Sequence, residues 1–234
     1  MDTLLSPPVL LTAFLGGVVP AFVWLFFWLL EDRCHPEPKR FIFYTFLCGM
    51  VAVIIAYPLE RFFAQFTTNQ LLIFLMWASV EEVLKFGAAY LAALRFAVYD
   101  EPLDAIIYMA TAALGFSALE NAAFLWAPVA SNDTLRAFVT EDLRFMGATL
   151  LHVLASVTIG ICLAFAFFSP AKTRKMAAAA GLILAISLHT LFNFFILQGG
   201  KSPSTFWVFI CIWFGTVAAL LLTERIKQPS KDYC

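Results

Sequence analysis

Long apolar runs separated by short polar segments dominate this chain. Seven of the runs are long enough to cross the roughly 30 Å hydrocarbon core of a bilayer as helices. They cover residues 8–30, 41–59, 70–94, 104–127, 145–168, 176–197 and 205–222. Because no linker or change of composition interrupts the pattern, it predicts one all-α, polytopic transmembrane helical bundle of about seven spans, forming a single domain over residues 1–234.

Composition supports this prediction. Of the 234 residues, 62% are hydrophobic and only 13% are charged, whereas a soluble domain carries about 25% charged residues. The chain is therefore expected to be an integral membrane protein. A net charge of −1 gives no basic footprint for nucleic acid, which excludes nucleic-acid binding as the expected function.

The distribution of Lys and Arg predicts the orientation, because cytoplasmic loops carry an excess of basic residues. With seven spans, one side of the membrane receives Arg33, Lys39, Arg40, Arg95, Lys172, Arg174, Lys175, Arg225, Lys227 and Lys231. The other side receives Arg61, Arg136, Arg144 and Lys201. This asymmetry predicts an N-terminus outside and a C-terminus in the cytosol.

Several ionisable side chains lie inside the apolar runs, where each costs roughly 2.5–3.5 kcal/mol on insertion scales. They come from four different predicted spans: Glu81, Glu82 and Lys85, then Glu120, then His152, then His189. A helical rise of about 1.5 Å per residue places the carboxylates and imidazoles in one band in the outer half of the membrane. The pattern indicates a polar functional site built inside the bilayer.

The third span carries the sequence Glu81-Glu82-Val83-Leu84-Lys85. Glu81 and Lys85 are i,i+4 neighbours, so we expect them to pair. Glu82 points about 100° away around the helix and is expected to lack a partner on its own helix. That would leave Glu82 available as a general base. The alternative is a purely structural ion pair with a polar neighbour.

The other polar groups admit both structural and chemical interpretations. Glu120, followed by Asn121, and His152 lie beside small residues, and each alone is typical of an interhelical hydrogen bond. His189 and Asn193 are i,i+4 neighbours that face the same way. Two such hydrogen-bond donors are suited to an oxyanion, although a polar clamp between helices is the alternative.

Together these motifs resemble the PrsW family of intramembrane proteases. The resemblance rests on EExxK at Glu81–Lys85, GFxxxEN at Gly115–Asn121, His152, and HxxxN at His189–Asn193. The loop Pro36-Glu37-Pro38-Lys39 is similar to that family's PEP-containing loop, and Asp104 also fits its pattern. The resemblance extends over about residues 31–193. It implies an intramembrane endopeptidase of the bacterial plasma membrane that cuts a membrane-anchored protein, typically an anti-sigma factor, at its outer side.

The wider group of CAAX-type prenyl endopeptidases and bacteriocin-processing homologues has EExxxR, FxxxH and HxxxN motifs. By that pattern Glu81 or Glu82 is the general base that activates water, and His189 with Asn193 forms the oxyanion hole. The chain departs from it twice, because Lys85 stands one position early and Glu120 stands where a His is usual. Glu120 or His152 would then assist the base, with Lys85 and Asn121 in support.

The need for a metal is left open by these residues. Glutamates and histidines could hold Zn²⁺, and the expected ligands in that case are Glu82, Glu120, His152 and His189. The chain has no HExxH motif, so a zincin-like site is excluded. We favour the metal-free glutamate mechanism that the wider group implies.

Two other functions fit the same polar groups. A proton- or cation-coupled transporter uses carboxylates and histidines at mid-depth, but it predicts inverted repeats and broken helices, which the sequence does not display. A non-catalytic membrane scaffold that kept an ancestral pocket is the third hypothesis.

Overall fold

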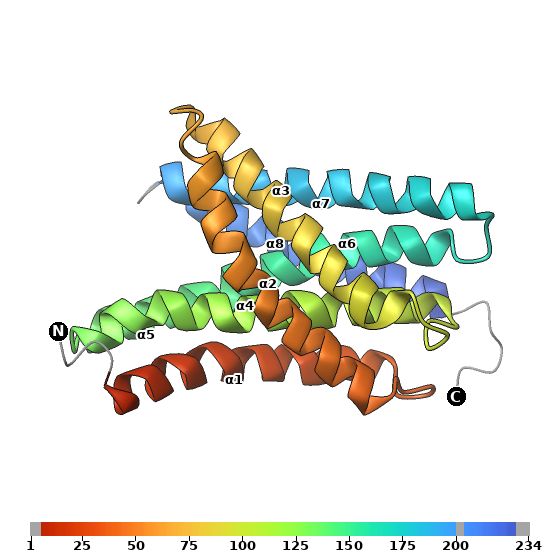
Figure 1. The fold of residues 1–234 in the computed structure, drawn as a ribbon, viewed down its shortest axis with the longest axis horizontal. Coiled ribbons are helices and arrows are strands. Elements are labelled where there is room, and N and C mark those ends of the chain that lie inside the picture. The colour runs from red at the N-terminus through yellow and green to blue at the C-terminus, as the bar shows by residue number, and fades with distance from the viewer. Residues whose placement is uncertain (1–5, 200–203, 228–234) are drawn as a thin grey trace.

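The computed structural model describes residues 6–199 and 204–227, and the elements in these ranges are helices (Figure 1). The helices are α1 (Pro7–Glu31), α2 (Lys39–Phe63), α3 (Gln70–Ala89), α4 (Pro102–Ala130), α5 (Thr134–Leu143), α6 (Thr149–Phe165), α7 (Ala171–Gly199) and α8 (Ser204–Lys227). Two short π-helical segments, η1 (Tyr90–Leu94) and η2 (Arg144–Ala148), follow α3 and α5. The predicted all-α fold is confirmed.

Six stretches among the described residues are long and apolar enough to cross a membrane: α1, α2, α4, the continuous Thr134–Phe165, α7 and α8. The sequence predicted a seventh span at residues 70–94. There, α3 has 20 residues, but its three ionisable side chains make it too polar to count as a span by composition. It nevertheless runs between the two ends of the bundle, packed against α2 and α7 (Figure 1).

The helix α4 lies at the centre of the bundle. In the membrane-spanning part of α4, 89% of residues are buried, against 28% in α7, and α1, α2 and α6 all pack against it. Small residues permit this close approach. A Cβ added at Gly115 would overlap the backbone carbonyl of Phe46, and one at Gly49 would overlap that of Ala112. The backbones of α2 and α4 therefore touch directly.

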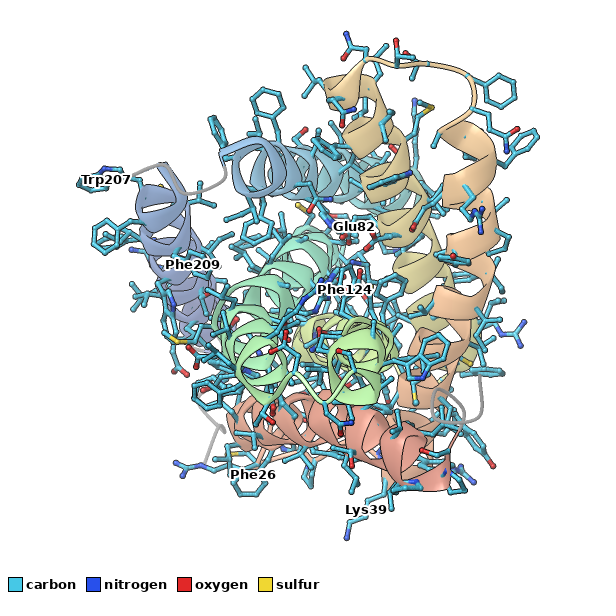
Figure 2. All side chains as sticks on the ribbon, turned by 90° about the vertical axis from the view of Figure 1, so that its left-hand side faces the viewer. Phe26, Lys39, Glu82, Phe124, Trp207 and Phe209 are labelled. Atoms are coloured by element: carbon cyan, nitrogen blue, oxygen red, sulfur yellow. The ribbon has the colours of Figure 1, made fainter. Side chains whose placement is uncertain are left out.

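The connecting segments alternate between the two ends of the bundle (Figure 1). Segments 32–38, 95–101 and 166–170 lie at one end, and segments 64–69 and 131–133 lie at the other. This alternation agrees with the predicted topology, in which the first group faces the cytosol. Of the basic residues used to predict the orientation, Lys201 and Lys231 lie outside the described residues. Figure 2 shows Glu82 in the interior of the bundle, away from its lipid-facing surface.

Candidate active site

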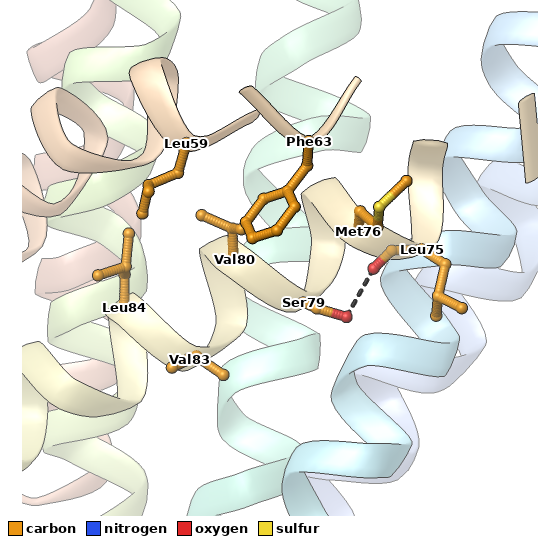
Figure 3. A pocket seen from close by; sticks show the side chains of 8 residues that line it. All are labelled: Leu59, Phe63, Leu75, Met76, Ser79, Val80, Val83 and Leu84. Carbon is orange, nitrogen blue, oxygen red and sulfur yellow. Dashed lines mark hydrogen bonds between the residues drawn. The ribbon is translucent and has the colours of Figure 1, made fainter. Parts of the chain in front are cut away.

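The polar residues of α3 face the interior of the bundle. The helix begins at Asn69, whose side chain accepts hydrogen bonds from the backbone N–H groups of the first turn. Twelve residues later, Glu81, Glu82 and Lys85 are all buried. The opposite face is apolar, and Figure 3 shows its side chains lining a groove of about 420 Å³ against α2. This amphipathicity aims the three ionisable groups at α4, α6 and α7.

Lys85 pairs mainly with Glu82, which corrects the predicted pairing. Its Nζ lies 2.6 Å from Glu82 Oε1 and 3.8 Å from Glu81 Oε2. An i,i+3 pair shares a helix face as readily as an i,i+4 pair. The prediction that Glu82 lacks a partner on its own helix was therefore wrong. Both side chains have 0% exposure, so the ion pair is fully withdrawn from water.

Glu82 also fixes the orientation of His189. The Nδ1 of His189, on α7, lies 2.8 Å from Glu82 Oε1, and Ser156 on α6 donates to Glu82 Oε2 at 3.2 Å. An ionised carboxylate only accepts hydrogen bonds, so His189 Nδ1 carries a proton. In the neutral ring, Nε2 then presents its lone pair, and this atom faces Glu81 at 3.8 Å.

His152, on α6, is held in a similar way from both sides. Its Nε2 lies 2.9 Å from Glu120 Oε2, and its Nδ1 lies 2.9 Å from Lys85 Nζ. Because the Lys85 ammonium can only donate, His152 Nδ1 accepts and Nε2 carries the proton that it donates to Glu120. Phe116, from the GFxxxEN motif on α4, packs beside the His152 ring at a centroid distance of 5.4 Å.

Three possible ligand atoms meet at Glu81, and one of them, His152 Nδ1, also accepts the hydrogen bond from Lys85. The Oε2 of Glu81 lies 3.6 Å from His152 Nδ1 and 3.8 Å from His189 Nε2, and it has no hydrogen-bond partner among the described residues. Glu81, His152 and His189 each offer one ligand atom, and these atoms all lie within 4.8 Å of one another. The arrangement can hold a metal ion or a polarised water molecule.

Arg144, which the sequence places among the basic residues of the outer side, is part of the site. This residue lies in η2, and its guanidinium binds the Glu120 carboxylate and Asn121 Oδ1. It also lies 4.0 Å from the centre of the Phe124 ring. Asn121 Nδ2 in turn donates to Thr149 Oγ1 at 3.0 Å. The sequence signal for this role was that Arg144 directly precedes the span that carries His152.

Among the described residues, Asn193 is not part of the hydrogen-bonded network of the site. It follows His189 by one turn on α7 and is half-buried, but no hydrogen bond within the described part of the chain involves its side chain. The structure therefore brings together six of the predicted side chains: Glu81, Glu82, Lys85, Glu120, His152 and His189. They come from four helices, as predicted.

Comparison with known proteins identifies relatives of this chain over most of its length. A protease PrsW of Geobacillus kaustophilus is 29% identical over 221 residues, which cover 92% of this chain and 93% of the relative. A protease PrsW of Bacillus subtilis is 28% identical over 192 residues, covering 77% and 81%. One of Halalkalibacterium halodurans is 26% identical over 225 residues, covering 95% and 97%. No solved structure matches the chain.

The family model described as "PrsW family intramembrane metalloprotease" matches residues 37–220. That range contains the α3, α4, α6 and α7 side chains that meet at the buried site. The chain is therefore a member of the PrsW family of intramembrane proteases.

Proposed function

We propose that this protein hydrolyses a peptide bond of a membrane-anchored substrate, of the anti-sigma-factor type, in the outer half of a bacterial plasma membrane. The observation that carries the proposal is the meeting of Glu81 Oε2, His152 Nδ1 and His189 Nε2 in the bundle interior. The Bacillus-type sources of the relatives support the bacterial membrane. Family membership favours this peptidase over the transporter and scaffold hypotheses.

Glu81 is the central group of the proposed mechanism. Glu82 has its oxygens occupied by Lys85, His189 and Ser156, so its work is to orient His189 and balance the Lys85 charge. Glu120 holds His152 in the matching way. Glu81 Oε2 alone of these three carboxylates keeps an unpartnered buried oxygen, and we assign to it the contact with the attacking water.

The donor set also fits the metal that the family description implies. One carboxylate oxygen and two imidazole nitrogens, with a fourth position open, are typical of catalytic zinc. The second nitrogen of each ring is bound to a carboxylate, Glu120 or Glu82, as metal-ligating histidines require. Zn²⁺ held there would lower the pKa of a bound water toward about 7.

This ligand set differs from the one expected from the sequence, since it contains Glu81 in place of Glu82 and Glu120. It also favours the metal-supported mechanism over the metal-free one. Lys85 contributes to the site in both the metal-supported and the metal-free mechanism, because its ammonium group donates a hydrogen bond to His152 Nδ1 at 2.9 Å. A metal at that nitrogen would leave Lys85 paired with Glu82 alone.

The exposure of the site residues supports cleavage from the outer side. Lys85 and Glu82 have side-chain exposures of 0%, whereas Glu120 reaches 20% and Arg144 reaches 14%. The site therefore opens past Glu120 and Arg144, toward the end of the bundle where α5 lies. That end is the predicted outer side of the membrane.

A proteoliposome assay tests the proposal. The purified protein is reconstituted with a single-span reporter, and the cut position is mapped by mass spectrometry. We expect one cut in the outer half of the reporter span or just outside it, abolished by His189→Ala and by Glu82→Gln. Glu224→Gln on α8 is the matched carboxylate control and should cut normally. A cut on the cytosolic side, or normal cutting by His189→Ala, would contradict the proposal.

Metal dependence is tested in the same assay. Treatment with 1,10-phenanthroline should stop cleavage, and added Zn²⁺ should restore it. Full activity of a preparation shown by mass spectrometry to contain no metal would refute the zinc site and support the metal-free mechanism.

A further inference from the structure

A carboxylate of α2 lies close to the proposed active site and has no part in the mechanism described above. Glu60 is half-buried in the last turn of α2, at the end of the bundle predicted to face outside. Its backbone carbonyl accepts a hydrogen bond of 3.2 Å from Trp77 Nε1 on α3. Trp77 precedes Glu81 by four residues and therefore shares its helix face. Glu60 thus lies about one helical turn nearer the outer end than Glu81.

The charge of Glu60 interacts with the charges of the site. Its carboxylate is repelled by those of Glu81 and Glu120 and attracted by the Lys85 ammonium. Lys85, however, pairs with Glu82 at 2.6 Å. Within residues 6–199 and 204–227, no Lys, Arg or His forms an ion pair with Glu60, and no hydrogen bond reaches its carboxyl group.

Two arginines at this end of the bundle are directed to other groups. Arg144 binds the Glu120 carboxylate on the far side of the opening. Arg61 donates to the hydroxyl of Tyr57 at 3.4 Å and lies over that ring. A carboxylate that is half withdrawn from water and repelled by two others is stabilised when a cation approaches it. The α2 side of the opening therefore presents a negative charge that is suited to an incoming cation.

We propose that Glu60 binds a cationic side chain of the substrate, Lys or Arg, on the outer side of the scissile bond, and so helps to select where the substrate is cut. Because Glu81 lies deeper than Glu60, a substrate chain that reaches it from the outer side passes Glu60. The indole of Trp77 also suits this ligand, since aromatic faces attract cations and the stem of Lys or Arg packs on apolar surface. A free metal ion would need several oxygen ligands, which this single carboxylate does not supply. The inference rests on the proposed peptidase function and adds the class of residue that the enzyme recognises.

A panel of single-span reporters in proteoliposomes tests the proposal. Each reporter carries Lys, Gln or Glu at one position, which is moved residue by residue along the segment on the outer side of the mapped cut. At one position we expect the unaltered protein to show a kcat/KM about tenfold higher for Lys than for Gln, and lowest for Glu. Glu60→Gln should cut the Lys and Gln reporters equally well, and Glu60→Lys should prefer the Glu reporter.

The order of preference separates recognition from a structural role. A structural defect would change the cleavage of all three reporters alike, whereas an inverted preference requires interaction with the substrate charge. Asp142→Lys, which alters an exposed carboxylate on α5 at the same end of the bundle, is the control and should keep the preference for Lys. If Glu60→Lys does not fold, the nearly isosteric Glu60→Gln decides the question.

Two results would overturn this inference alone. They are equal kcat/KM values of the unaltered protein for the Lys, Gln and Glu reporters at every position, and an unchanged preference for Lys in folded Glu60→Gln protein. Both leave the peptidase function intact, because the reporters are still cut. Failure of the unaltered protein to cut any reporter would instead refute the proposed function, and this inference with it.

Discussion

Replacing Lys85 by Met tests which carboxylate it balances. The ammonium is fully buried and donates to Glu82 at 2.6 Å. Met keeps the length of the side chain but removes the charge, so an ionised Glu82 would remain in the bundle interior without its cation. Breaking a buried pair in this way costs about 3–5 kcal/mol. We therefore expect Lys85→Met to be strongly destabilising by itself.

The distances predict which second substitution rescues the protein. At an effective dielectric constant of about 20, the attraction of Lys85 is roughly 6 kcal/mol for Glu82 at 2.6 Å and roughly 4 kcal/mol for Glu81 at 3.8 Å. The hydrogen bond to Glu82 adds about 1.5–3 kcal/mol. Glu82→Gln should therefore restore more stability to Lys85→Met than Glu81→Gln does.

Double-mutant cycles measure this difference. The free energy of unfolding is determined for each single and double variant in the same lipid or detergent, with Lys175→Met on the exposed part of α7 as the control. We expect the coupling energy of Lys85 with Glu82 to exceed that with Glu81 by about 2 kcal/mol or more. An equal or larger coupling with Glu81 would refute the assignment of Lys85 to Glu82.

Three further tests, two of them with a comparison variant, concern the surroundings of the site. Arg144→Gln should lower kcat/KM by about 10–100-fold by freeing Glu120, with an unchanged unfolding temperature. The kcat/KM of Arg144→Lys should be intermediate, because lysine lacks the planar fork of the guanidinium group. Gly115→Ala should destabilise the fold by about 1–3 kcal/mol through overlap with α2, whereas Gly87→Ala, where a Cβ meets nothing within 4 Å, should be neutral or stabilising in the same thermal unfolding assay. Asn193→Ala should lower kcat by about 10²–10³-fold if it binds the oxyanion, and an unchanged kcat would remove it from the site.

The convergence of the polar residues was predictable because the bilayer makes them costly. An ionisable side chain inside an apolar run needs partners on other helices. Four runs carried such groups at one depth, so Glu82, Glu120, His152 and His189 were expected to meet, and they do. The same argument predicted the helical fold, since only helices or closed barrels satisfy the backbone in lipid.

The pairings inside the site were not predictable from spacing alone. Lys85 can reach both i−3 and i−4 on its helix, and the choice depends on where α6 and α7 place His152 and His189. Both rings face Glu81 Oε2, while Lys85 remains with Glu82. Sequence spacing does not give the rotation of α3 about its axis. This rotation decides whether Glu81 or Glu82 keeps an oxygen without a hydrogen-bond partner.

The contacts of Arg144 are a second feature that the sequence pattern did not predict. The predicted spans 104–127 and 145–168 leave Arg136 and Arg144 in an outer connecting segment with room for a short surface helix, but α5, η2 and α6 form one continuous helical stretch. The π-helical segment η2 changes the helical phase, so the side on which Arg144 projects could not be read from a regular 3.6-residue period. Its contacts with Glu120 and Asn121 emerge only in three dimensions.

The rate of substrate cleavage by Glu81→Gln protein in proteoliposomes tests the central claim most directly. The substitution is nearly isosteric and removes the charge of the carboxylate whose oxygen faces His152 and His189. We expect no detectable cleavage and an unfolding temperature close to that of the unaltered protein. Cleavage at the normal rate by a folded Glu81→Gln protein would contradict the account.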